Sequence, residues 1–274
     1  MGIIHSTTDE KNNTTIVTGP EGTTVTERFF DGLTVSFKGE NNILVVPFGC
    51  RFINCSIKFQ GDEGFCLIEK TWNKKIPLNL NIWSRASFIA NENCSFNGRL
   101  NCIASEEKSV ILGRDTMFSF GTWIRTSDVH AIFDIDTKKV MNIGKDVILG
   151  DHVWIGQDTT LLKGTTIGSG AIVGLGSIVT KKILSNTINS GVPTKMLKNN
   201  ICWDRQSMHN YSEEDRLIYE AKNAEEKIQN FNYQDQEENQ ELFLAAVETF
   251  NKLPISQKLE FSKYFLENRL IILP

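Results

Sequence analysis

A six-residue pattern of apolar and small positions repeats from Ile143 to Leu184. It reads IGKDVI, LGDHVW, IGQDTT, LLKGTT, IGSGAI, VGLGSI and VTKKIL. The first position is aliphatic in all seven copies, the second is glycine in five, and the fifth is small or β-branched. A period of six fits neither a 3.6-residue helix nor a two-residue alternation. It predicts a mainly β, parallel solenoid whose aliphatic ladder points inward, while the residue before each aliphatic position points outward.

The same register continues toward the N-terminus and is interrupted once. Leu112, Phe118 and Ile124 are six residues apart, and strand-like runs from Leu33 onward predict earlier, less regular coils. Ile143 follows Ile124 by nineteen positions instead of six, so an excursion over 126–142 must leave the coil. We therefore expect a β-helix domain over 29–202, preceded by a flexible or weakly stranded segment, 1–28. Loops that leave a rigid scaffold often carry binding groups.

The C-terminal segment 203–274 has a different composition and predicts helices. Gly191 is the last glycine, and a helical apolar face begins after Ser212, a residue typical of a helix N-cap. Two further helices are expected, over 240–253 and from 256 to about 269. We expect this extension to cover the open end of the solenoid, because an unpaired strand edge needs covering. A docking surface for another protein or for a glycan is the alternative.

Composition narrows the functional classes. The net charge of −4 gives no reason to expect a nucleic-acid partner. The apolar stretches are far shorter than the ~20 residues of a membrane span, and no signal-peptide pattern opens the chain. The six cysteines form no CxxC pair, which favours reduced thiols. These features predict a cytoplasmic protein without a membrane span.

Four motifs follow one another between His130 and Lys198. They are SDVHAI, then DHVWIG twenty-four residues on, then VGLGSIVTK and GVPTKML. In this order and spacing the stretch resembles the left-handed β-helix hexapeptide-repeat acyltransferases, and most closely the bacterial capsule and polysialic acid (sialic acid) O-acetyltransferases. The resemblance is strong over 112–198, weaker over 30–111 and not detectable beyond 205. It also supplies the left hand of the coil, which the period alone does not give.

This resemblance implies a homotrimer with acetyl-CoA, the co-substrate, bound in a groove between neighbouring subunits and a carbohydrate hydroxyl as the acceptor. It implies that His130 is the general base, which suits an imidazole because it titrates near neutrality. Trp154 would lie beside the thioester sulfur, and it should face outward because it precedes Ile155 in the coil. The residues expected to contact the coenzyme are Gly156, Gly174, Thr180, Lys181, Lys195 and Lys198.

Other residues have less specific expected roles. Asp128 and His152 are candidate contacts to the acceptor, and His152 is equally a candidate structural residue in its corner. Asp128, Asp134 or Asp136 is a candidate to orient the imidazole of His130. No metal is expected.

Several other functions use the same solenoid. An N-acetyltransferase of an amino sugar or a serine O-acetyltransferase would differ only in the acceptor pocket. A zinc-dependent hydratase would need about three histidines around the metal, and the chain has four in all. A non-catalytic solenoid for binding or scaffolding is the alternative outside the enzymes.

Overall fold

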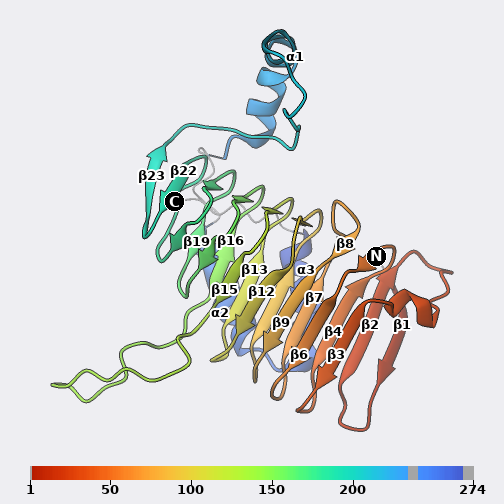
Figure 1. The fold of residues 1–274 in the computed structure, drawn as a ribbon. Helices are drawn as coiled ribbons and strands as arrows, with labels where there is room; N and C mark the ends of the chain where they lie inside the picture. Colours follow the sequence, from red (N-terminus) through yellow and green to blue (C-terminus); the bar gives the residue numbers. More distant parts are fainter. Residues whose placement is uncertain (1, 234–239, 268–274) are drawn as a thin grey trace.

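The computed structural model describes residues 2–233 and 240–267, which form a three-sided parallel β-solenoid followed by helices (Figure 1). Each coil passes through one strand of each side in turn. We call the sides the first, second and third flanks. Neighbouring strands of a flank belong to successive coils, so their pairing is parallel except in the β1–β2 and β22–β23 hairpins.

The strands fall into these three flanks. The first flank contains β1 (Gly2–Thr8), β2 (Thr14–Gly19), β4 (Ile43–Pro47), β7 (Phe65–Ile68), β10 (Ser87–Ala90), β13 (Ser109–Leu112), β16 (Val147–Leu149) and β19 (Thr166–Ile167). The second flank contains the pair β5 (Arg51–Phe52) and β8 (Lys75–Ile76), followed by β11 (Ser95–Phe96), β14 (Met117–Phe118), β17 (Trp154–Ile155), β20 (Ile172–Val173), β22 (Ile188–Gly191) and β23 (Thr194–Lys198). The third flank contains β3 (Leu33–Phe37), β6 (Cys55–Phe59), β9 (Leu78–Ile82), β12 (Leu100–Ala104), β15 (Trp123–Arg125), β18 (Thr160–Leu161) and β21 (Ile178–Val179).

The aliphatic ladder forms the core of the solenoid, as the repeat predicts. Its six members from Leu149 to Val179 are fully buried: Leu149, Ile155, Leu161, Ile167, Val173 and Val179. The prediction is wrong for the first copy, because Ile143 is 62 % exposed. Ile143 lies in the returning arm of the excursion, and the coil resumes only at Val147.

Strand pairing begins before residue 29. β1 and β2 form an antiparallel hairpin, and β2 pairs in parallel with β4. A short 3-10 helix, η1 (Glu27–Phe30), then leads into β3.

Two helices cover the first flank. α2 (Gln240–Lys252) and α3 (Ile255–Glu267) pack Phe243, Phe250 and Phe265 against outward-facing residues of β7, β10 and β13. The expectation that they cover the open end of the solenoid is therefore wrong. The first-flank strands are apolar on both faces, in runs such as FCLI and SVIL, so their outer face also needs burial.

The remaining α-helix, which precedes these two in the chain, lies apart from this layer. α1 (Glu213–Phe231) projects away from the side of the solenoid (Figure 1), and none of its residues is buried. It begins where the sequence predicts, because Ser212 and Asp215 form a reciprocal capping box.

Candidate functional site

The excursion that carries His130 leaves the solenoid between β15 and β16, at the edge between the third and first flanks, and projects away from it (Figure 1). Asn142 closes its neck. The Asn142 side chain donates to the carbonyl of His130 (2.8 Å) and to Asp128 (3.1 Å), and accepts from the backbone N–H of Ile132 (2.8 Å). Lys163, from the next coil, donates to Asp128 and to the carbonyl of Asn142. These bonds fix where the loop departs from the coil.

Two of the acids near His130 serve the loop itself. The hydrogen bond from Lys163 is the main reason that the pKa of Asp128 is lowered. Asp134 accepts from the backbone N–H of Thr137 (2.6 Å) and from its hydroxyl (2.8 Å), which closes a turn at the tip. Both contacts hold the loop backbone rather than the exposed imidazole.

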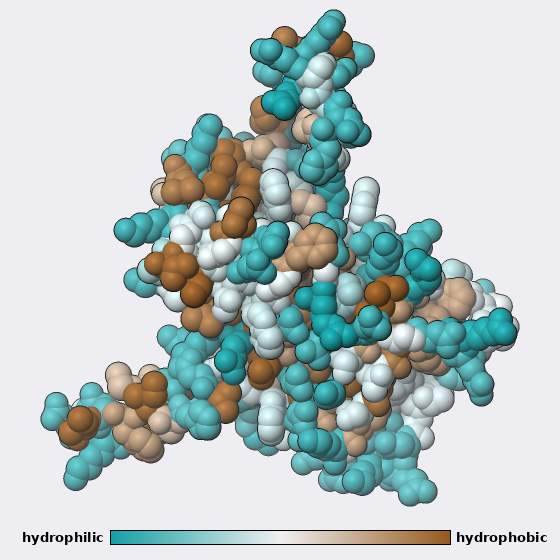
Figure 2. Space-filling model, in the orientation of Figure 1, coloured by the Kyte–Doolittle hydropathy of each residue, from teal (hydrophilic) through white to brown (hydrophobic). Residues whose placement is uncertain are grey.

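The projecting part of the excursion exposes several large apolar side chains beside the charged Asp136, Lys138 and Lys139. Figure 2 shows hydrophobic surface along it, and Ile135 is 91 % exposed. Ile132, Phe133 and Met141 are also more than half exposed. A soluble domain rarely presents such a patch to water unless another surface covers it.

Trp154 lies on the second flank and points outward, as the alternation along the strand predicts. Trp154 is 38 % exposed. The indole lies 5.8 Å from the ring of Trp203, measured between centroids. Both rings line a cleft of about 1210 Å³ between the second flank, the connector 200–209 and α1. The other lining residues include Asn97, Met117, His209, Tyr219 and Ile228.

His152 is buried behind this cleft. Its ring is stacked between the rings of Trp203 and Phe231, with centroid-to-centroid distances of 3.9 Å and 3.8 Å. Nδ1 lies 2.6 Å from Asp115 Oδ2, and Nε2 lies 2.8 Å from the carbonyl oxygen of Trp203. Both nitrogens and both ring faces are thus engaged, so His152 joins the connector to the solenoid and presents no free edge to a ligand.

Asp115 connects His152 to Arg205. Burial raises the pKa of Asp115, but the hydrogen bond with His152 and the charge of Arg205 outweigh it, so the pKa is lowered. Arg205 also donates to Ser95 and lies over the ring of Trp72. Sequence reasoning missed Trp203 and Arg205, because neither belongs to the repeat or to a recognised motif.

The two candidate glycines serve the stacking of the coils. The N–H of Gly156 donates to the carbonyl of Val173 (2.8 Å), and the N–H of Gly174 donates to that of Asn189 (2.7 Å). A Cβ at Gly156 would lie 2.6 Å from the backbone nitrogen of Leu175. The next coil therefore requires glycine at this position whether or not a ligand is present.

The remaining candidate contacts to the coenzyme lie toward the C-terminal end of the solenoid. Thr180 and Lys181 are exposed directly after β21. Lys195 and Lys198 are exposed on β23, which pairs antiparallel with β22. All four side chains are exposed on the last coils, Lys181 after a third-flank strand and Lys195 and Lys198 on a second-flank strand.

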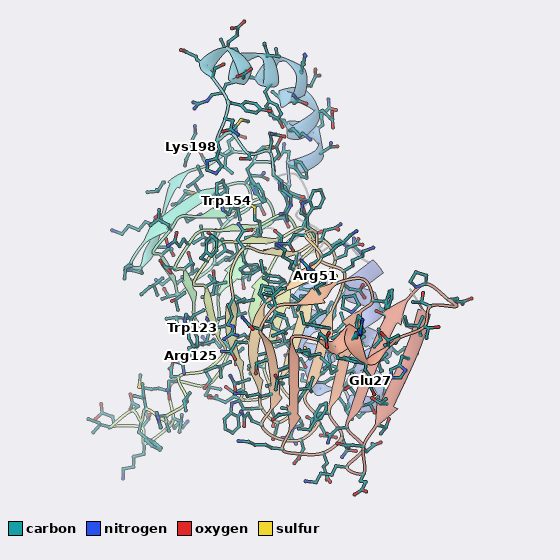
Figure 3. All side chains as sticks on the ribbon, turned by 45° about the vertical axis from the view of Figure 1, so that its right-hand side comes forward. Glu27, Arg51, Trp123, Arg125, Trp154 and Lys198 are labelled. Atoms are coloured by element: carbon teal, nitrogen blue, oxygen red, sulfur yellow. The ribbon has the colours of Figure 1, made fainter. Side chains whose placement is uncertain are left out.

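A single chain does not bring His130 and Trp154 together. His130 extends from the edge between the third and first flanks, whereas Trp154 lies on the second flank, well above the projecting arm in Figure 3. The candidate base and the candidate thioester site are therefore on different sides of the triangular coil.

Within residues 2–233 and 240–267, no three His, Cys, Asp or Glu side chains are grouped so that they could hold a metal ion. Among the same residues, no helix has the length and apolar character needed to span a membrane. All six cysteines are free, and five of them are buried.

Comparisons with known proteins point to one kind of enzyme. No family model matches the chain. Over 103 residues it is 43 % identical to a polysialic acid O-acetyltransferase of Escherichia coli O1:K1 / APEC, which covers 38 % of this chain and 34 % of the relative. Over 116 residues it is 29 % identical to a polysialic acid O-acetyltransferase of Neisseria meningitidis, covering 42 % of this chain and 53 % of the relative. The chain thus spans about a third and about half the length of these two relatives.

A solved structure gives the wider likeness. The crystal structure of the polySia specific acetyltransferase NeuO superposes with a TM-score of 0.60 and 27 % identity, covering 70 % of this chain and 99 % of NeuO. The fold is the left-handed parallel β-helix of the hexapeptide-repeat acyltransferases, with a C-terminal helical extension. The resemblance to the polysialic acid O-acetyltransferases is confirmed.

Proposed function

We propose that this protein is an acetyl-CoA-dependent O-acetyltransferase that acts on a hydroxyl of a bacterial capsule carbohydrate, with a sialic acid polymer as the acceptor class. The observation that carries the proposal is the structural likeness to NeuO, which extends over 99 % of the NeuO chain. In this protein, Trp154 lies on a strand of the solenoid and faces outward. An exposed indole that lines a large cleft is typical of a side chain that contacts a bound ligand, here the co-substrate, and not of one that contacts only water.

The proposed reaction is a direct transfer. His130 takes the proton of the acceptor hydroxyl as its oxygen attacks the thioester carbonyl, so that a C–O bond forms while the C–S bond breaks. The sulfur leaves as the coenzyme A thiolate. The donor-only N–H of Trp154 suits stabilisation of the charge that develops on that sulfur. Lys181, Lys195 and Lys198 are proposed to bind the coenzyme's phosphates.

The site is proposed to lie between two subunits of a homotrimer. Two features support this: His130 and Trp154 lie on different flanks of one chain, and the arm that carries His130 presents apolar side chains to solvent. Covering that arm with a neighbouring coil would bury its exposed side chains and bring His130 to the neighbour's Trp154.

An acceptor screen tests the proposal. Purified protein and acetyl-CoA are incubated with polysialic acid, a neutral capsule-type glycan, an amino sugar and serine. Free coenzyme A and the mass of the acceptor are measured. We expect polysialic acid to gain acetyl groups that alkali removes, as befits an ester. Acetylation of the amino sugar or of serine alone would replace the proposal with one of the alternatives.

A further inference from the structure

Carboxylates are absent from one part of the solenoid surface. Four segments, 51–59, 75–82, 95–104 and 117–125, form the second and third flanks, and the corner between them, in four successive coils. They contain no Asp or Glu but five cations: Arg51, Lys58, Lys75, Arg99 and Arg125. We call this surface the basic wedge. The rest of the same coils (60–74, 83–94 and 105–116) contains seven Asp and Glu together with five Lys and Arg, so the carboxylates are confined to one part of each coil while the cations are not.

Within the described part of the chain, none of the wedge cations forms an ion pair with a carboxylate, although the charge of Arg125 contributes to the lowered pKa of Asp128. Arg51, Lys58, Lys75 and Arg99 are exposed. Arg51 and Lys75 even face each other in register on neighbouring strands. Like charges placed directly opposite each other on a sheet are destabilising, so the chain bears this cost without an internal counter-charge.

The third-flank side of the wedge also presents groups that suit sugars. Trp123 is 42 % exposed and neighbours Asn101 in register, which in turn neighbours Asn79. The Asn79 side chain donates to that of Asn101 (2.9 Å). Sugar rings stack on exposed indoles, and amides bond their hydroxyls. Trp123 and Arg125, labelled in Figure 3, lie at the root of the excursion that carries His130.

We propose that the basic wedge is a track that holds an extended anionic polysaccharide and leads it to the root of the His130 excursion. A chain with one carboxylate per sugar spaces its charges along its length, as the wedge spaces its cations coil by coil. β6 and β15 are three coil steps apart, or about 14 Å, so the track holds several sugars. Over that length duplex DNA would carry about eight charges, more than the five cations offered, so an acidic glycan fits better than a nucleic acid. The identity of the sugar rests on the proposed function.

The test compares two triple variants that each remove three positive charges. The wedge variant is Arg51→Gln, Lys58→Gln and Lys75→Gln, in the two coils farthest from the excursion. The control is Lys11→Gln, Lys222→Gln and Lys252→Gln, three exposed lysines elsewhere. Fluorescent polysialic acid, neutral dextran of similar length and an oligothymidine are titrated without acetyl-CoA. Thermal unfolding and sedimentation check that both variants fold and assemble like the wild type.

We expect the wild type to bind polysialic acid but not dextran, with affinity that falls as salt rises. The wedge variant should bind roughly tenfold more weakly or worse, and the control within about twofold of the wild type.

Equal weakening in both variants, or none in the wedge variant, would overturn the proposal. Oligothymidine bound as tightly as the glycan would indicate a general polyanion surface. Altered sedimentation of the wedge variant would indicate that the wedge is a contact between copies of the chain. Tight oligothymidine binding or altered sedimentation would each also overturn the proposed glycan track. A protein that binds through the wedge yet acetylates no sugar would refute only the proposed function.

Discussion

His130 is the residue whose removal should separate chemistry from folding most clearly. Its side chain is exposed on the excursion, so His130→Ala removes no core contact. If the imidazole is the general base, turnover should fall by about 100- to 10,000-fold, while acetyl-CoA binding and the melting temperature stay unchanged. Steady-state kinetics with calorimetry would measure this. His5→Ala, in β1, is the matched control, and a His130 variant that keeps near-normal turnover would remove this residue from the mechanism.

How far sequence predicts a residue's surroundings depends on which part of the chain supplies them. The outward direction of Trp154 follows from its place before Ile155, because alternation along a strand is local. The burial of His152 does not follow, since its covering rings, Trp203 and Phe231, come from a later segment without the repeat. The glycine requirement at Gly156 is local as well, because the next coil recurs at a fixed spacing.

At the scale of elements, the neck of the excursion should control how precisely His130 is placed. Asn142→Asp keeps the side-chain size and the acceptor for Ile132, but it loses the bond to the carbonyl of His130 and places a second carboxylate beside Asp128. We expect kcat to fall by about tenfold, with the unfolding free energy changed by less than about 1 kcal/mol, because the loop lies outside the core. Lys139→Ala, at the loop tip, is the control. Unchanged kcat in the Asn142 variant would show that the neck does not position the base.

The packing of α3 on the first flank should depend on pH through Lys258. This side chain is 1 % exposed, donates to the carbonyl of Arg85 and to Ser87 (both 3.1 Å), and lies over the ring of Phe250. Burial lowers its pKa to about 8. The unfolded chain holds this proton up to about pH 10.4, so folding releases it between these values and the free energy of unfolding rises with pH there.

Urea unfolding from pH 7.5 to 10 would measure this slope. The part due to Lys258 is at most about 1.4 kcal/mol per pH unit and should vanish in Lys258→Met. Lys263→Met, an exposed lysine on the same helix, should keep the wild-type slope. Because tyrosines and cysteines also titrate in this range, the informative quantity is the difference between the two variants. Equal slopes in both would refute the role of Lys258.

The elements differ in how well the sequence predicts them. The coils from Leu149 onward and the start of α1 at Ser212 were predictable, because a strict period and a capping box are local signals. The place of α2 and α3 was not, because a run such as SVIL looks the same whether its outer face meets a helix or another coil. Ile143 was misassigned because its hexapeptide matches the repeat while its backbone still belongs to the excursion.

At the scale of the whole molecule, the decisive property is whether one active site draws on two chains. Co-expressing His130→Ala and Trp154→Ala chains under different affinity tags would test this. In a mixed assembly, an interface is intact only when a chain with its His130 meets a chain with its Trp154. Every doubly purified trimer contains both kinds of chain, and in a closed ring of three just one of its three interfaces pairs an intact His130 with an intact Trp154. We therefore expect doubly purified assemblies to recover about a third of normal turnover, whereas each variant alone is nearly inactive. If both residues instead acted within one chain, every chain would lack one of them, and no mixture would recover activity.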